Sequence, residues 1–219
     1  MPVLRPIRHL IFDLDGTLID SSRGVVDAVN YSLRLMNQPE QPAGRIRAFI
    51  GYPLEVMYPE FTDAPLAELR HHFQIRARET MVSSTVALPD VDRTLTTLKD
   101  AGYRLAVATT KIQRHVGGIL DRFGWSSLFD VTVGADDVEQ VKPSPDAFIL
   151  AMYRMGASPS DSIAIGDTIN DIAAAQAVPM RVVAVTSPYG DNSEMLARNP
   201  DHHLESVAEL PALLNKLSS

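Results

Sequence analysis

The chain has 219 residues, of which 45% are hydrophobic and 21% charged, ordinary values for a folded globular protein. Its 20 Lys and Arg against 27 Asp and Glu give a net charge of −7, which argues against binding a nucleic-acid polymer. The lack of cysteine excludes disulfides and thiol chemistry, and neither a secretory signal nor a membrane-spanning apolar run is present. We therefore expect a cytoplasmic protein without a membrane partner, either a monomer or a small homo-oligomer.

Short apolar runs that end at polar residues recur along the chain. They cover 9–12, 104–108, 129–133, 162–165 and 181–185. Runs of this length, rich in β-branched residues and without alternation, indicate strands buried on both faces of a parallel sheet. Helical patterns lie between them, at 91–101, 112–123, 145–155 and 169–177. This alternation predicts a doubly wound α/β fold, which carries its sites at the carboxyl ends of the strands.

The stretch from 19 to 87 has a different character, because it contains helical patterns and no strand-like run. The amphipathic segments lie near 24–36, 42–50, 53–58 and 65–81. A block of this length without strands, placed after the first strand, is best explained as an inserted helical subdomain. We therefore predict a helical subdomain over 19–85 and a core formed by 1–18 and 86–219.

Two carboxylates, Asp13 and Asp15, follow the first predicted strand within the sequence Asp13-Leu14-Asp15-Gly16-Thr17-Leu18. Strand alternation sends both side chains to the same side. Carboxylates that converge in this way repel each other, so they favour a bound cation. Taken alone, the Asp-Gly pair is equally typical of a turn.

A second acidic pair, Asp167 and Asp171, follows another predicted strand at the start of a helix. Helix capping by either residue is the alternative interpretation. Because the carboxyl ends of parallel strands meet at one edge of a sheet, we expect both acidic pairs to lie there. Unoccupied, two such pairs would be hard to tolerate, and hard oxygen ligands of this kind favour Mg²⁺.

Two further polar segments follow other predicted strands. Lys142-Pro143 adds a positive charge in an extended segment, although most lysines are simply surface residues. Thr109 and Thr110 offer hydroxyls and backbone N–H groups near the start of a helix, which suits either an anion site or a plain helix cap.

Taken in chain order, these motifs resemble the haloacid dehalogenase superfamily of hydrolases, specifically its phosphatases. The segment Asp13–Leu18 is similar to the first family motif, 107–109 to the second, Lys142-Pro143 to the third and 166–171 to the fourth. The inserted helices resemble the cap of the phosphoglycolate-phosphatase-like branch. The resemblance covers nearly the whole chain and implies a Rossmann-like catalytic core with a helical cap.

The resemblance also implies a Mg²⁺-dependent phosphatase that works through an aspartyl-phosphate intermediate. Asp13 would be the nucleophile, and Asp15 would act first as the acid and then as the base. The metal would be held by Asp13, the backbone carbonyl of Asp15 and Asp167, with Asp171 as direct or water-mediated support.

The same resemblance assigns the binding of the phosphate group. Lys142 would neutralise Asp13 and one phosphate oxygen. The Thr109 hydroxyl and the Thr110 backbone N–H would bind other phosphate oxygens. The expected partner is therefore a small phosphate ester.

Other activities, within and outside this family, can be compared with a phosphatase on the basis of the residues present. An acid at Asp15 favours phosphatase over dehalogenase chemistry, because an alkoxide leaving group needs a proton and a halide does not. Phosphonate cleavage needs a cap lysine, and 19–87 contains none. A sugar phosphomutase shares all four motifs and stays open. A non-enzymatic phospho-accepting receiver module fits poorly, because its acceptor lies after a middle strand and it has no cap.

Substrate specificity is expected from the cap loop that begins at Arg47 and includes Gly51 and Tyr52. Arg47 would meet an anionic group of the substrate, or else it is a surface charge. Tyr52 would stack on or hydrogen-bond the substrate, or else it packs within the cap. Phosphoglycolate-like, sugar and nucleotide-like phosphates are all compatible with these residues.

Overall fold

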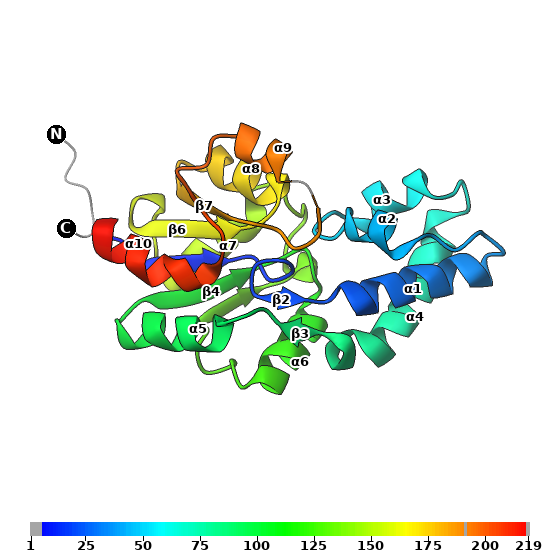
Figure 1. Ribbon diagram of the computed structural model, residues 1–219, viewed down its shortest axis with the longest axis horizontal. Coiled ribbons are helices and arrows are strands. Elements are labelled where there is room, and N and C mark those ends of the chain that lie inside the picture. The colour runs from blue at the N-terminus through cyan, green and yellow to red at the C-terminus, as the bar shows by residue number, and fades with distance from the viewer. Residues whose placement is uncertain (1–5, 191, 218–219) are drawn as a thin grey trace.

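A parallel six-stranded sheet lies in the left-hand part of the computed structural model, which describes residues 6–190 and 192–217 (Figure 1). The strand order is β5-β4-β1-β6-β7-β8, and each neighbouring pair is parallel. The strands are β1 (His9–Phe12), β4 (Arg104–Ala108), β5 (Val131–Val133), β6 (Ser162–Gly166), β7 (Arg181–Val185) and β8 (His202–Leu204). This sheet confirms the predicted parallel α/β fold.

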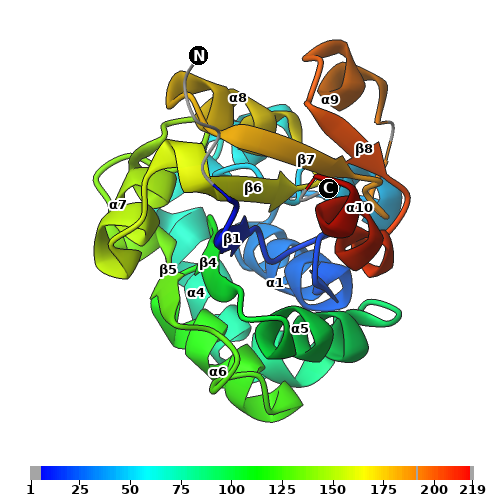
Figure 2. The ribbon, with the colours of Figure 1, turned by 90° about the vertical axis from the view of Figure 1, so that its left-hand side faces the viewer.

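Helices cover both faces of the sheet, because each inner strand sends apolar side chains to both sides (Figure 2). In β1, Leu10 and Phe12 enter one core cluster and Ile11 enters the other. The first cluster is completed by α5 (Val91–Asp100), α6 (Gln113–Phe123) and α10 (Leu210–Leu217). The second is completed by α7 (Asp146–Met155), α8 (Ile169–Ala177) and α9 (Ser193–Ala197). Full burial of each such side chain contributes about 1.5–3 kcal/mol to the stability of the folded state. The helices on the two faces therefore hold the sheet between them.

A second group of helices lies beyond the sheet, on the right of Figure 1. It consists of α1 (Ser22–Leu35), α2 (Ala43–Arg47), α3 (Leu54–Met57), a 3₁₀ turn (Tyr58–Glu60) and α4 (Leu66–Ser84). These helices have their own apolar cluster, in which α1 packs along α4. Within that cluster the buried hydroxyls of Tyr58 and Ser32 form a hydrogen bond of 2.6 Å. The four helices coincide with the helical patterns of the sequence.

Two chain crossings connect the helical group to the sheet, and they pair with each other as short strands. β2 (Ile19–Asp20) and β3 (Val86–Ala87) form an antiparallel two-stranded ribbon. The expectation that 19–87 contains no strand is therefore wrong at its two ends, because a two-residue strand is too short to leave a pattern. The edge strand β8 was also missed, since its sequence His-His-Leu is not an apolar run.

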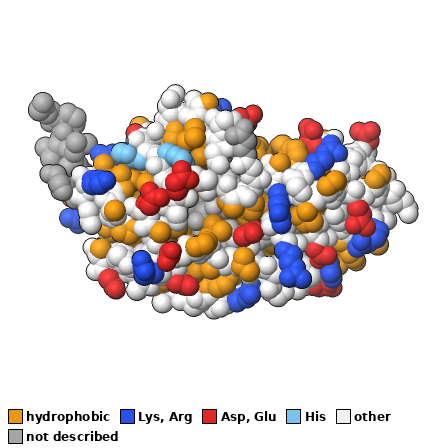
Figure 3. All heavy atoms as spheres, viewed as in Figure 1, with side chains coloured by type: hydrophobic (Ala, Val, Ile, Leu, Met, Phe, Trp, Pro, Cys, Tyr) orange, Lys and Arg blue, Asp and Glu red, His pale blue; other side chains and the backbone are white. Residues whose placement is uncertain are grey.

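Among the described residues, no helix is long and apolar enough to cross a bilayer. On the face shown in Figure 3, basic and acidic side chains are interspersed over both the sheet layer and the helical group.

Candidate functional site

Three buried carboxylates meet where β1 and β6 end. Asp13 follows β1, Asp167 follows β6, and Asp171 lies in the first turn of α8. One oxygen of each lies within 4.8 Å of the others, and none of the three residues is more than 3% exposed. Because β1 and β6 are neighbours in the sheet, the topology brings together two motifs that are about 150 residues apart.

Asp167 is held by two hydroxyls. Thr17 Oγ1 donates to one carboxylate oxygen at 2.9 Å, and Ser187 Oγ donates to the other at 2.6 Å. Ser187 lies in the loop after β7 and was not predicted from the sequence. Gly16 passes so close that a Cβ placed there would lie 2.0 Å from Asp167 Oδ2, and its φ of +85° also favours glycine. The Asp-Gly step is therefore both a turn and part of this site.

The two carboxylate oxygens of Asp171 have different roles, one in capping α8 and the other in binding Lys142. Its Oδ2 accepts hydrogen bonds from the backbone N–H and the hydroxyl of Thr168, the N-cap of α8, which completes a capping box. Its Oδ1 accepts a hydrogen bond from Lys142. The N-cap is thus Thr168 and neither of the two aspartates, although Asp171 does take part in capping.

Lys142 reaches the carboxylates from the loop between β5 and α7. Its Nζ lies 2.5 Å from Asp13 Oδ1 and 2.5 Å from Asp171 Oδ1, and the residue is 2% exposed. The surface interpretation of this lysine is therefore wrong. The Lys142–Pro143 peptide bond is cis.

The electrostatics of the cluster show an excess of negative charge. Burial raises the pKa of Asp13 to about 7, although Lys142 opposes the shift. Burial, together with the charges of Asp13 and Asp171, also raises the pKa of Asp167 well above its usual value. For Lys142, burial acts to lower the pKa, but the two carboxylates outweigh it and raise the pKa. Three carboxylates around one ammonium leave an excess of negative charge that a further cation would neutralise. Hard oxygen donors of this kind fit Mg²⁺.

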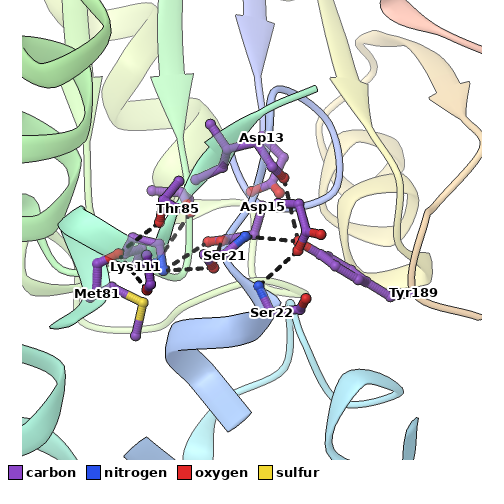
Figure 4. Close-up of polar contacts among 12 residues, drawn as sticks. Asp13, Asp15, Ser21, Ser22, Met81, Thr85, Lys111 and Tyr189 are labelled. Atoms are coloured by element: carbon purple, nitrogen blue, oxygen red, sulfur yellow. Dashed lines mark hydrogen bonds and ion pairs between the residues drawn. The ribbon is translucent and has the colours of Figure 1, made fainter. Parts of the chain in front are cut away.

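The Asp15 carboxylate lies outside this cluster and faces the ribbon that leads to α1 (Figure 4). Lys111 Nζ lies 3.2 Å from its Oδ2, and Ser21 Oγ donates a hydrogen bond to its Oδ1. The side chains of Asp15 and Lys111 are each only 8% exposed. Sequence reasoning missed Lys111, and the one local signal was its position directly after Thr109 and Thr110.

Thr109 and Thr110 lie in the loop that follows β4. Thr109 is 2% exposed, and its N–H donates to the carbonyl of Val133 in the neighbouring strand β5. Its hydroxyl accepts a hydrogen bond of 3.2 Å from the Lys111 N–H. Helix α6 begins only at Gln113, with Ile112 at the N-cap, so neither threonine caps this helix.

The predicted specificity residues are placed differently from one another. Gly51 reaches the sheet layer: Asn170 Nδ2 lies 3.5 Å from its carbonyl oxygen, and a Cβ on Gly51 would lie 2.8 Å from Thr168 Cγ2. Tyr52 is half-buried, and burial and the charge of Glu194 raise its pKa. Arg47 is exposed.

Arg47 lies on a hollow of the helical group. The hollow, of about 470 Å³, lies between α1 and α2 and is also lined by Arg23 and Asn30. Of the three residues predicted to set specificity, Gly51 is the one that contacts residues at the rim of the carboxylate cluster, Thr168 and Asn170.

Comparisons with known proteins give a consistent family. The family model described as haloacid dehalogenase-like hydrolase matches residues 10–185. A protein named "Probable phosphatase IndB" from Dickeya dadantii is 36% identical, with 96% of each chain covered. A phosphoglycolate phosphatase of Pectobacterium atrosepticum is 33% identical over 100% of this chain and 97% of its own.

The solved structures agree with the sequence matches. A haloacid dehalogenase-like family hydrolase from Streptococcus pneumoniae superposes with a TM-score of 0.87 at 26% identity, covering 94% of this chain and 98% of its own. Together, these similarities confirm the family and the fold that the motifs predicted, and the relatives' names agree with a phosphatase.

Proposed function

The chain belongs to the haloacid dehalogenase-like hydrolases, and we propose that its buried acidic site hydrolyses small phosphomonoesters through an aspartyl phosphate, the acyl phosphate of Asp13. The observation that carries this proposal is the meeting of Asp13, Asp167 and Asp171 with Lys142 at the ends of β1 and β6. The main obstacle in this chemistry is the repulsion between an anionic carboxylate and an anionic phosphate. A lysine and a cation beside the carboxylate reduce this repulsion, so the two groups can approach each other.

In the first half-reaction, a carboxylate oxygen of Asp13 attacks phosphorus and forms a new P–O bond. The P–O bond to the substrate alcohol breaks, and its electron pair stays on the alcohol oxygen. Asp15 donates a proton to that oxygen, so the alcohol leaves in its neutral form.

In the second half-reaction, Asp15 takes a proton from a water molecule. The water oxygen attacks phosphorus, and the bond to Asp13 breaks. Inorganic phosphate leaves, and the Asp13 carboxylate and the Asp15 proton are restored for the next cycle.

The remaining groups bind the phosphate and the cation. Lys142 would neutralise Asp13 and a phosphate oxygen, and the Thr109 hydroxyl and Thr110 N–H would bind other phosphate oxygens. When bound by Asp13, Asp167 and the Asp15 carbonyl, with Asp171 in support, Mg²⁺ supplies positive charge that offsets the repulsion between carboxylate and phosphate.

We assign the helical group over 19–85 as a cap on the core formed by 1–18 and 86–219. The contact of Gly51 with Thr168 and Asn170 supports this assignment, because it sets the cap loop at the rim of the carboxylate cluster. A cap in this position would restrict the site to small esters and limit the access of bulk water, while the water that hydrolyses the aspartyl phosphate must still enter. Two relatives are named for phosphatase activity, one of them on phosphoglycolate, which makes small phosphorylated acids and sugars the first esters to test.

The test is inorganic phosphate release from a panel of small phosphate esters in the presence of Mg²⁺. Asp13→Asn should abolish release, because an amide lacks the carboxylate oxygen that forms the aspartyl phosphate, whereas Asp63→Asn at an exposed position should behave as wild type. Conversion of a phosphosugar into its isomer without phosphate release would instead identify a mutase. An Asp13→Asn protein with wild-type rates would overturn the mechanism.

A further inference from the structure

Lys111 has a side chain that is largely shielded from solvent, and the proposed reaction leaves it without a role. Its side chain is 8% exposed, and its ammonium lies 3.2 Å from the carboxylate of Asp15 and 3.5 Å from Ser21 Oγ. A lysine loses much of its hydration when it is buried, so its retention there calls for a compensating contact. The contact in this structure is the carboxylate to which the proposed mechanism assigns proton transfer (Figure 4).

The two oxygens of Asp15 are held from two separate parts of the chain. Oδ1 is held by Ser21, in the segment that leads into α1, and Oδ2 is held by Lys111, in the loop after β4. A carboxylate with one fixed oxygen can still turn about that contact, whereas a second contact restricts the turn. The ion pair with Lys111 is therefore a second restraint on rotation of the Asp15 carboxylate, in addition to the hydrogen bond from Ser21.

Lys111 lies in the same loop as the residues that we assign to phosphate binding. It follows directly after Thr109 and Thr110, which we assign to phosphate binding, and its N–H donates to the Thr109 hydroxyl. The same short loop thus carries the groups that would bind the phosphate and the group that holds the acid. A displacement of about 1 Å between acid and leaving group can lower a rate by about 100-fold, so this shared loop has a direct kinetic consequence.

We propose that Lys111 is a positioning residue, whose ammonium holds the Asp15 carboxylate at the place from which it protonates the leaving alcohol. This proposal rests on the phosphatase mechanism above. The proton itself moves between Asp15 and the ester oxygen, and Lys111 neither gains nor loses one.

The proposal predicts a dependence on the leaving group. Expulsion of p-nitrophenolate needs little protonation, whereas expulsion of benzyl alkoxide needs a well-placed acid. The ratio kcat/KM reports the steps up to departure of the alcohol, so it isolates this role of Asp15 from the later attack by water. Lys111→Met should lower kcat/KM for benzyl phosphate by about tenfold more than for p-nitrophenyl phosphate.

Two further variants make the experiment specific. Lys111→Arg retains a positive charge near Asp15 and should recover a large part of the benzyl phosphate activity. Lys99→Met removes an ammonium from another Lys–Asp pair, with Asp130, on the exposed side of α5, and should leave both activities at wild-type level.

Each alternative has its own outcome. An equal loss of kcat/KM for both esters would overturn the positioning role and indicate general damage to the site. A loss confined to esters that carry a carboxylate, seen as a raised KM, would show that Lys111 binds the substrate instead. If the wild-type protein cleaves neither ester nor any other phosphate ester with Mg²⁺, the phosphatase proposal itself fails.

Discussion

The sheet side and the cap side of the site are built in contrasting ways. On the sheet side, Asp13, Asp167 and Lys142 are buried, and each has at least one close ionic or hydrogen-bonded partner. On the cap side, Gly51 meets the core through a long hydrogen bond of 3.5 Å, and Arg47 is exposed. The groups that we propose for the chemistry are thus fixed by buried contacts, whereas those that we propose for substrate selection lie at the end of α2 and in the loop after it, where they are held less tightly.

The largest expected effect tests the sheet side of this contrast. Asp167→Asn removes one charge from the crowded cluster and one expected ligand of Mg²⁺. We expect the Mg²⁺-dependent rate of phosphate release to fall by about 1000-fold or more, because the oxygen donor set is incomplete. Activity measured across a Mg²⁺ titration, with Asp63→Asn as the exposed control, checks this result.

A thermal measurement separates loss of the ion from loss of the fold. Because burial raises the pKa of Asp167, its ionised form is disfavoured in the folded protein, and the amide should leave the melting temperature without Mg²⁺ unchanged or higher. Mg²⁺ should raise the melting temperature of the wild type and have little effect on the variant. A variant that is stabilised by Mg²⁺ as strongly as the wild type would remove Asp167 from the metal site.

The second prediction concerns the place where the core and the helical group touch. There, Arg122 of α6 donates to the carbonyls of Val82 and Thr85 at the end of α4. His115 is buried on the same helix, and burial, with Lys111 and Arg114 nearby, lowers its pKa from 6.5 to about 4. The unfolded chain therefore binds a proton at this histidine more readily than the folded one between pH 6.5 and pH 4.

The stability that this shift contributes is fully present above pH 6.5 and is lost as the pH falls toward 4. The size of the shift corresponds to about 3 kcal/mol of unfolding free energy. Glutamine does not titrate, so His115→Gln should lack this component. Between pH 7 and pH 4 the variant should therefore lose less unfolding free energy than the wild type, and at pH 4 it should be about as stable as the wild type or more stable. Denaturant unfolding of both proteins at the two pH values measures the difference, and parallel behaviour would contradict it.

Much of the sheet side was predictable because its signals are local. Each apolar run marks a strand, each acidic motif follows its strand directly, and a parallel sheet collects strand ends at one edge. The pairing of Asp15 with Lys111 was not predictable, because it joins two loops whose approach depends on the packed positions of β1 and β4. The hydrogen bond from Ser187 to Asp167 was not predictable either, because no sequence motif connects the two residues.

The smallest expected effect tests the cap side, where Gly51 lies against Thr168. Gly51 has a φ of +92°, and a Cβ there would lie 2.8 Å from Thr168 Cγ2, so alanine is both strained and crowded. A strain of about 1 kcal/mol or more should shift the loop away from α8 and lower kcat/KM by up to about tenfold, mainly through KM. Gly44→Ala is the matched control, because it lies in the same helical group with open space around its Cβ.

A second substitution sharpens the same test. Thr168→Ser retains the hydroxyl that caps α8 but removes the methyl group that the new Cβ would meet. The double variant Gly51→Ala, Thr168→Ser should therefore recover part of the lost kcat/KM, while the backbone strain at position 51 keeps it below wild type. If Gly51→Ala alone leaves KM and the relative rates on several esters unchanged, and Arg47→Ala and Tyr52→Ala do the same, then the cap loop does not select the substrate. The contrast between a tightly held chemical side and a less tightly held selective side would then not hold for this protein.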